Sequence, residues 1–186
     1  MPFAVHLFFD AKTEAIIKSA WRKLADTGIA SYMYQSANRP HLSLAIYQQV
    51  NLKGCEHLLK SFAAARNPLP VDFQHFGIFS TTPAAVFLAS TVTSSLLELH
   101  LQIHEILHSI CTDSNPYYLP GKWVPHCTLA LDLEPRWITQ ALDIGLQLSL
   151  PLSGEITEIG VIEFRPVRHL FGFPLGDRIR EKAEAT

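Results

Sequence analysis

The chain has 186 residues, of which 48% are apolar, enough to build one compact domain or two small lobes. Only 17% of the residues are charged, and the formal net charge is −2. Proteins that grip a long nucleic-acid duplex by its phosphates usually carry a basic stripe, and this charge balance argues against such a partner. No run of about 18 apolar residues occurs, so we expect no membrane span.

The first elements in chain order are a strand, a helix and a second strand. Residues 3–9 are nearly all apolar, as in a buried strand. An apolar stripe at helical spacing follows over 12–26 and stops near Gly28, a residue type that often ends helices. Pro40 breaks any helix and leads into an apolar, β-like run over 41–47.

The middle of the chain predicts a helix, a hairpin and a longer helix. Helical spacing covers 52–65, and two prolines close it. Two β-like runs, 71–79 and 84–90, flank the turn signal Ser-Thr-Thr-Pro. The amphipathic segment 94–110 is the long helix of this region.

The last third opens with a loop rich in turn and aromatic residues, 113–125. We expect a strand over 126–133 and then a helix over 136–146. Two further strands are expected, one within 154–164 and one over 169–175.

One short phrase, Pro-His-x-Ser/Thr-Leu, occurs twice, with its two copies 85 residues apart and each opening a predicted strand. Because side chains alternate between the faces of a strand, His41 and Ser43 point the same way, as do His126 and Thr128. Two imidazoles, each with a hydroxyl beside it, form a symmetrical acid–base pair suited to a phosphate group. This pattern predicts the functional site.

The same offset relates the predicted elements around the two motifs, which indicates an internal duplication. We expect an α+β fold of two pseudo-symmetric lobes, with antiparallel β-sheet inside, helices outside and a central cleft. The predicted organisation is one bilobal domain over 1–176, with repeats over about 3–90 and 91–175. The charged segment 177–186 is predicted to be a tail.

The duplicated motif resembles the two-histidine (2H) phosphoesterase superfamily, which includes the 2'-5' RNA ligase and cyclic phosphodiesterase proteins. The resemblance rests on RPHLSLAIY and NPYYLPGKWVPHCTLAL, and through element order it extends over about 3–175. Family members often carry a Tyr-x-Pro loop and a Trp ahead of the second motif, and Tyr118, Pro120 and Trp123 match that habit. Ser43 departs from the commoner Thr but keeps the hydroxyl.

The resemblance implies a phosphoesterase that hydrolyses 2',3'-cyclic phosphates of nucleotides or RNA ends and leaves a 2'-phosphate. It also implies possible reversal, in which RNA ends are joined through a 2'-5' linkage. The expected partner is a small nucleotide or an RNA 2',3'-cyclic phosphate end. ADP-ribose cyclic phosphate, nucleoside cyclic phosphates and RNA ends cannot be separated from the sequence, nor can hydrolysis be separated from ligation.

Opening a cyclic phosphate requires a base for the attacking oxygen and an acid for the leaving oxygen. His41 and His126 are the predicted catalytic pair, because imidazoles titrate near neutral pH. Ser43 and Thr128 are predicted to donate hydrogen bonds to the non-bridging phosphate oxygens. The scheme needs no metal and no cofactor, and the near-equivalence of the two histidines leaves their acid and base roles open.

Five further residues are weaker candidates for substrate contact. Tyr118 and Trp123 either stack on a nucleobase at the rim of the cleft or pack their own loop in place. The cations Arg39, Lys122 and Arg168 are candidates for phosphate contact, although an ordinary solvated surface position is favoured for each.

Two alternatives from other classes remain open. His104 and His108 form a His-Glu-x-x-His pattern on the helix 94–110, as in zinc peptidases, with His100 one turn earlier. These histidines run along the edge of an apolar stripe, which favours a packing role. The second alternative is a non-catalytic nucleotide-binding module with the same cleft.

The chain has three cysteines, an odd number without clustering, which is typical of reduced thiols in an intracellular protein. The first residues lack a basic segment and meet Asp10 early, so no signal peptide is expected. Alternation turns Cys127 away from the cleft and argues against a thiol nucleophile. We therefore expect a cytoplasmic protein, acting as a monomer.

Overall fold

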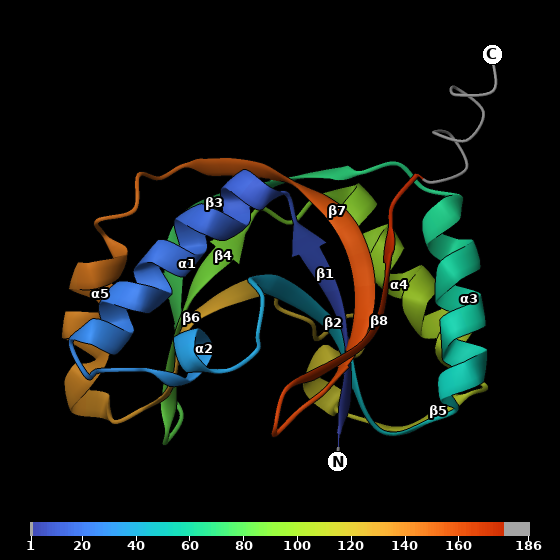
Figure 1. Ribbon diagram of the computed structural model, residues 1–186, viewed down its shortest axis with the longest axis horizontal. Coiled ribbons are helices and arrows are strands. Elements are labelled where there is room, and N and C mark those ends of the chain that lie inside the picture. The colour runs from blue at the N-terminus through green and yellow to red at the C-terminus, as the bar shows by residue number, and fades with distance from the viewer. Residues whose placement is uncertain (1, 177–186) are drawn as a thin grey trace.

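The structure is a computed structural model that describes residues 2–176, so the predicted tail lies outside the described residues. The described part forms five α-helices: α1 (Ala11–Asp26), α2 (Tyr32–Gln35), α3 (Leu52–Ala64), α4 (Ser94–Leu107) and α5 (Ile138–Gly145) (Figure 1). Its eight strands are β1 (Phe3–Phe9), β2 (His41–Val50), β3 (Leu69–Phe79), β4 (Ala84–Ser90), β5 (Cys111–Ser114), β6 (His126–Leu133), β7 (Leu152–Glu163) and β8 (Arg168–Pro174).

The eight strands form one curled antiparallel sheet in the order β5-β2-β1-β7-β3-β4-β6, with β8 also paired to β7. The long strand β7 serves both sides of this sheet, because its start pairs with β3 and its later residues pair with β1 and β8. It arches over the molecule in Figure 1 and lets the sheet curl until β2 and β6 come into contact. The two motif strands therefore face each other.

Helices cover the outside of each side of the sheet, as predicted for this fold class. In Figure 1, α1 and α5 lie together at one end of the molecule, and α3 and α4 lie at the other. Helix α1 contacts β6 and β7, whereas α3 contacts β7 and β8. Among the described helices, none is long and apolar enough to cross a membrane.

Local sequence signals explain where the main helices begin and end. The Asp10 carboxylate caps α1 by accepting from the Thr13 amide at 3.0 Å, and the chain leaves α1 through Gly28 at a φ of +75°. Asn51 and Thr93 cap α3 and α4 in the same way. These three helices begin within one residue of the predicted positions.

Four elements differ from the sequence prediction. Helix α4 ends at Leu107 rather than residue 110, because the chain then turns into the unpredicted strand β5, which pairs with the end of β2. The helix predicted over 136–146 starts as a 3-10 turn, Pro135–Trp137, before α5. The short helix α2 was also not predicted, since four residues carry no periodic signal.

The order α1, β2, α3, β3, β4 recurs about 85 residues later as α4, β6, α5, β7, β8. Pairing nevertheless mixes the two halves of the sequence, since β1 pairs with β7 and β4 with β6. Each side of the sheet thus contains strands from both halves. The division into repeats over 3–90 and 91–175 stays a prediction.

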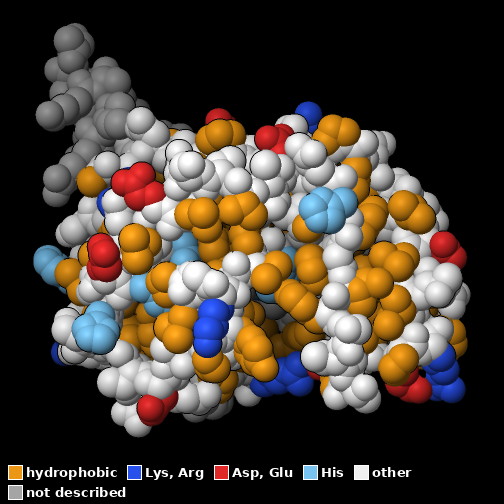
Figure 2. Space-filling view, turned by 180° about the vertical axis from the view of Figure 1, so that it is seen from behind, with side chains coloured by type: hydrophobic (Ala, Val, Ile, Leu, Met, Phe, Trp, Pro, Cys, Tyr) orange, Lys and Arg blue, Asp and Glu red, His pale blue; other side chains and the backbone are white. Residues whose placement is uncertain are grey.

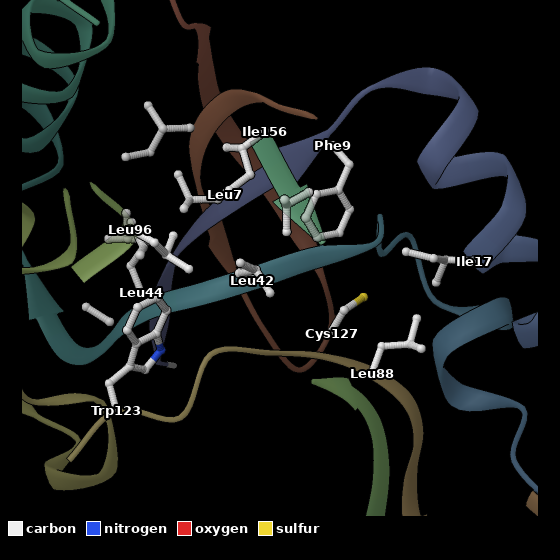
Figure 3. Close-up of a cluster of buried hydrophobic side chains, with 14 of the residues drawn as sticks. Leu7, Phe9, Ile17, Leu42, Leu44, Leu88, Leu96, Trp123, Cys127 and Ile156 are labelled. Atoms are coloured by element: carbon white, nitrogen blue, oxygen red, sulfur yellow. The ribbon is translucent and has the colours of Figure 1, made fainter. Parts of the chain in front are cut away.

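A continuous hydrophobic core runs through both sides of the sheet. Figure 3 shows Leu42 and Cys127 pointing into it from β2 and β6, together with Leu7 and Ile156. Leu42 and Cys127 are completely buried. The residue between the histidine and the hydroxyl of each motif therefore packs inward, as strand alternation predicted, and the polar pair faces the other way.

Candidate active site

The four polar residues of the two motifs line one cavity of about 230 Å³. His41 and Ser43 come from β2, and His126 and Thr128 come from β6. The structure thus brings together all four residues predicted for catalysis and phosphate binding. Figure 2 shows a hollow in the surface on the side that it presents, bordered by hydrophobic side chains and by Lys or Arg side chains.

Both motif strands carry a β-bulge at the same position, the leucine of each motif. In the pairing of β1 with β2, His6 lies opposite Ser43 and Val5 opposite Ala45, so Leu44 is skipped. In the pairing of β4 with β6, Thr128 and Ala130 have consecutive partners and Leu129 is skipped in the same way. Bulges bend a strand and redirect its side chains, often beside active sites.

The bulges change which residues reach the cavity. Simple alternation would place Ala45 and Ala130 beside the hydroxyl residues, but both are fully buried in the core. Ile46 and Leu131, one residue later, line the cavity instead. These two apolar positions were missed at the sequence level, because a bulge has no periodic signature of its own.

Each motif histidine is held by the same local hydrogen bond. Nδ1 of His41 lies 2.5 Å from the Arg39 carbonyl oxygen, and Nδ1 of His126 lies 2.7 Å from the Val124 carbonyl oxygen. A carbonyl only accepts, so each Nδ1 carries the hydrogen and donates it. Nε2 is left as the nitrogen of each ring that can take up or release a proton.

The two histidines differ in their surroundings. The His41 ring stacks on His6, with ring centroids 3.7 Å apart and planes 8° from parallel. Burial is the main cause that lowers the pKa of His41 to about 4, and the nearby His126 and His169 lower it further. The hydrogen bond to the Arg39 carbonyl acts in the opposite direction. His41 is therefore neutral over the whole physiological range.

His126 packs against a pair of aromatic rings that also contact each other. The centroids of Phe79 and Phe87 lie 4.9 and 5.0 Å from its own. Burial lowers the pKa of His126 from its ordinary value, and the hydrogen bond to Val124 opposes that shift. The pKa of His41 falls far enough to reach about 4, whereas His126 shows the more modest shift, so His126 is the easier of the two to protonate.

The aromatic loop before β6 is packed down around Trp123. This ring is only 9% exposed, stacks on His100 at 4.1 Å and donates from Nε1 to the Ser43 carbonyl at 2.8 Å. Tyr118 lines the cavity, and burial raises its pKa against an opposing hydrogen bond with Ser43. Tyr117 is the exposed aromatic residue of the loop, at 78%.

A second cavity of about 350 Å³ adjoins the first, and both are lined by Phe79, Tyr118 and His126. Lys122, Trp123 and Tyr117 contribute to this second cavity. The weak candidates Lys122, Tyr118 and Trp123 thus lie beside the histidine pair. Tyr117 was missed because it stands next to Tyr118 in a segment with no periodicity.

The structure places the other two candidate cations away from the cavity. Arg39 forms ion pairs with Glu14 at 2.8 Å and Glu158 at 3.0 Å, and Arg168 pairs with Glu163 at 3.5 Å. Neither side chain lines either cavity.

The cation at the cavity is Arg165, which the sequence analysis missed. Its guanidinium pairs with Asp132 at 2.7 Å and lies over the Tyr32 ring. Arg165 and Arg168 both lie in the short segment between the last two predicted strands, and only the path of the chain decides which of the two lines the cavity.

The His-Glu-x-x-His pattern of α4 has a packing role. His100 and His104 both direct Nε2 toward the Leu44 carbonyl, at 3.0 and 3.2 Å, and His108 is exposed past the end of the helix. Within residues 2–176, no group of three His, Cys, Asp or Glu side chains is arranged to hold a metal ion. The histidines of α4 instead fasten this helix to the bulge of β2.

Comparisons with known proteins agree with the fold. A family model described as the 2'-5' RNA ligase superfamily matches residues 13–167. No curated protein matches the chain.

Solved structures share the fold at low sequence identity. E. coli LigT complexed with 3'-AMP is 17% identical with a TM-score of 0.60, and the match covers 94% of this chain and 99% of LigT. TT0787 of Thermus thermophilus is 18% identical with a TM-score of 0.62, covering 95% and 98%. Usb1 of Kluyveromyces marxianus is 16% identical with a TM-score of 0.52, covering 94% and 98%.

The family match spans most of the chain, and the duplicated motif lies within it on two facing strands of the shared fold. The chain therefore belongs to the 2'-5' RNA ligase superfamily, the two-histidine phosphoesterase group that its motifs resemble.

Proposed function

We propose that the protein hydrolyses 2',3'-cyclic phosphates of nucleotides or RNA ends by two-histidine acid–base catalysis and leaves a 2'-phosphate. One observation carries the proposal: His41 and His126, each fixed through Nδ1, line the same cavity as Ser43 and Thr128. That arrangement supplies two proton-transfer groups and two hydroxyl donors around one small anion.

The different surroundings of the two histidines favour a direction for the reaction. His41, with the lower pKa, is the base that takes a proton from water as its oxygen attacks phosphorus. His126, the easier to protonate, gives its proton to the 3'-oxygen as the bond from that oxygen to phosphorus breaks. Each positioned group is worth about 10²–10⁴-fold in rate. Ser43 and Thr128 donate to the non-bridging oxygens, where negative charge develops.

The adjoining cavities suit a substrate with a phosphate at one end and a ring at the other. The smaller cavity holds the histidines, and the larger one is lined by aromatic and apolar side chains with Lys122. LigT has been crystallised with 3'-AMP, a nucleotide of this kind. A mononucleotide or the end of an RNA is therefore the proposed substrate, and reversal would join RNA ends through a 2'-5' linkage.

The proposed setting is cytoplasmic. All three cysteines are unpaired and buried, which fits a reducing compartment. Each motif completes the same cavity within one chain, and a monomer is accordingly proposed as the working unit.

The test is hydrolysis of a panel of 2',3'-cyclic nucleotides with excess EDTA present. We expect turnover by the wild type and loss of it in the double variant His41→Ala/His126→Ala, with 2'-phosphates as products. The matched control replaces two exposed histidines that line neither cavity, His57→Ala/His75→Ala, and keeps full activity.

Three results would contradict the proposal. Undiminished activity in the His41/His126 double variant would exclude the mechanism. Saturable nucleotide binding by the wild type without any phosphomonoester product would favour the non-catalytic binding module instead. Loss of activity with EDTA would show that the reaction depends on a metal ion.

A further inference from the structure

Two tryptophans hold the backbone of the two motifs from the opposite half of the sequence. Trp123 donates its indole N–H to the Ser43 carbonyl at 2.8 Å, and Trp21 donates to the Thr128 carbonyl at 2.9 Å. Trp21 lies in α1 ahead of the first motif but supports the second, and Trp123 lies just ahead of the second motif but supports the first. In both cases the accepting carbonyl belongs to the hydroxyl residue itself.

These carbonyls lie at the bulges described above. The skipped residue is Leu44 after Ser43 and Leu129 after Thr128. A bulge disrupts the hydrogen-bond ladder locally, and a buried carbonyl without a partner is costly. The indole N–H groups satisfy the backbone where the ladder is interrupted, immediately beside each hydroxyl.

Both indoles are themselves fixed. Trp21 is 1% exposed within the core. Trp123 stacks on His100 with the two planes 4° apart, and His100 lies within hydrogen-bond distance of the carbonyls of Leu44 and Tyr118. Because each indole is held rigidly, its hydrogen bond fixes the position of the carbonyl that it binds. The backbone of Ser43 and of Thr128 is therefore fixed as well.

We propose that Trp123 and Trp21 are positioning residues that set the Ser43 and Thr128 hydroxyls, respectively, for the phosphate. The inference rests on the proposed function, because it assigns these residues a role through the two hydroxyls. Misplacement of a reacting or stabilising group by about 1 Å can cost on the order of 10²-fold in rate. Neither tryptophan takes part in proton transfer.

The test replaces each donor by a ring without an N–H. Trp21→Phe and Trp123→Phe are expected to lower kcat by about 10-fold, since the hydroxyls act most strongly as charge develops. KM should stay nearly unchanged in Trp21→Phe, whereas Trp123 also lines the larger cavity, so Trp123→Phe should raise KM as well. The control is Trp137→Phe, the same change at the exposed tryptophan outside both cavities, which should leave kcat and KM unaltered. Thermal unfolding checks that each variant is folded.

Double variants identify which hydroxyl each tryptophan acts through. Ser43→Ala and Thr128→Ala should each lower kcat by about 10²–10³-fold. Trp123→Phe should add almost nothing to Ser43→Ala but multiply the loss of Thr128→Ala, and Trp21→Phe should show the reverse pattern. For each tryptophan, the combination with the hydroxyl residue that it does not contact serves as the control in which the two losses should simply multiply.

The possible outcomes separate the two claims. Two results would overturn the positioning role. One is that the losses multiply as fully when each tryptophan is combined with its own hydroxyl residue (Trp123 with Ser43, Trp21 with Thr128) as in the other two combinations. The other is an unchanged kcat in the single tryptophan variants. Unchanged kcat in Ser43→Ala and Thr128→Ala would instead overturn the proposed function. If a phenylalanine variant fails to fold, site-specific benzothienylalanine keeps the ring size and stacking but lacks the N–H, and the same pattern of losses is then required of it.

Discussion

His41 and His126 share one local geometry and differ in what surrounds them. The Nδ1 bond to a carbonyl two residues earlier is common to both, because the two motifs have the same sequence pattern. His41 is stacked on the buried His6, whereas His126 packs against two neighbouring phenylalanine rings. Equivalent residues of the motif can thus take unequal roles, and their separate pKa values favour the proposed assignment of His41 as base and His126 as acid.

The pH dependence of kcat/KM tests this assignment. Rate rises with pH as His41 loses its proton, which places the ascending limb near pH 4. Rate falls as His126 loses its proton, and because its pKa is lowered from 6.5, the descending limb lies below 6.5. We expect an optimum between these limits for the free enzyme.

The profile of kcat should extend to higher pH, because a bound anionic phosphate favours the protonated form of His126. Both profiles are measured with one cyclic nucleotide in a buffer series of constant ionic strength. A kcat/KM optimum above pH 7 would contradict the assignment.

The elements that carry the motifs depend on close packing between neighbouring strands. Gly77 of β3 lies directly opposite Phe87 of β4, and the Phe87 ring covers the place where a side chain on Gly77 would stand. Phe87 is in turn packed against His126 and Phe79. The hairpin of β3 and β4 therefore sets one wall of the site through a position where any side-chain carbon would overlap the Phe87 ring.

Gly77→Ala should displace Phe87 and with it His126. We expect a loss of about 1–3 kcal/mol in the free energy of unfolding from overpacking, and a fall in kcat larger than the stability loss explains. Urea unfolding and steady-state kinetics provide the two measurements. Gly54→Ala is the control, because a methyl group there meets only the side chain of the N-cap residue Asn51, at ordinary contact distances of 3.4 Å or more. Normal kcat in folded Gly77→Ala would contradict this role of the hairpin.

At the scale of the whole molecule, several buried histidines make stability depend on pH. Burial lowers the pKa of His6 well below its ordinary value, and it lowers that of His41 and of His100 to about 4. The unfolded chain binds protons at these positions below pH 6.5 while the folded protein does not. The contribution of these histidines to the free energy of unfolding is therefore fully present above pH 6.5 and is lost as the pH falls toward 4.

For His41 alone this loss is on the order of 3 kcal/mol. The measurement is urea unfolding at steps between pH 7.5 and pH 4. His6→Phe keeps an aromatic ring beneath His41 and removes one buried titrating group, so it should flatten the dependence, whereas the exposed-site variant His57→Ala should not. Stability that stays constant down to pH 4.5 would contradict this account.

The sequence was sufficient for most of the elements, although not for α2 or β5, and for bringing the four polar motif residues to one cavity. Helices such as 12–26 and strands such as 3–9 followed from periodicity, since a long apolar pattern has only one way to face a core. His41 and His126 were predicted to share a site because the duplicated motif implies two equivalent strands, and the cavity contains both.

The tertiary structure decided the features that depend on strand pairing and on the path of the chain. The bulges at Leu44 and Leu129 appear only once partner strands are known, and they bring Ile46 and Leu131 to the cavity. Arg165, and not Arg168, lines the cavity because of the path that the chain takes between β7 and β8.

The sequence by itself determined that the histidine and the hydroxyl of each motif face the same way, because strand alternation within each motif is a local property. Only the tertiary structure decided which side chains bind the backbone of each motif, and why the two histidines have different surroundings. The contacts of Trp21 with Thr128 and of Trp123 with Ser43 span 107 and 80 residues, and His6 reaches His41 across two paired strands. Burial, and with it each pKa, depends on such distant neighbours, which no local pattern specifies.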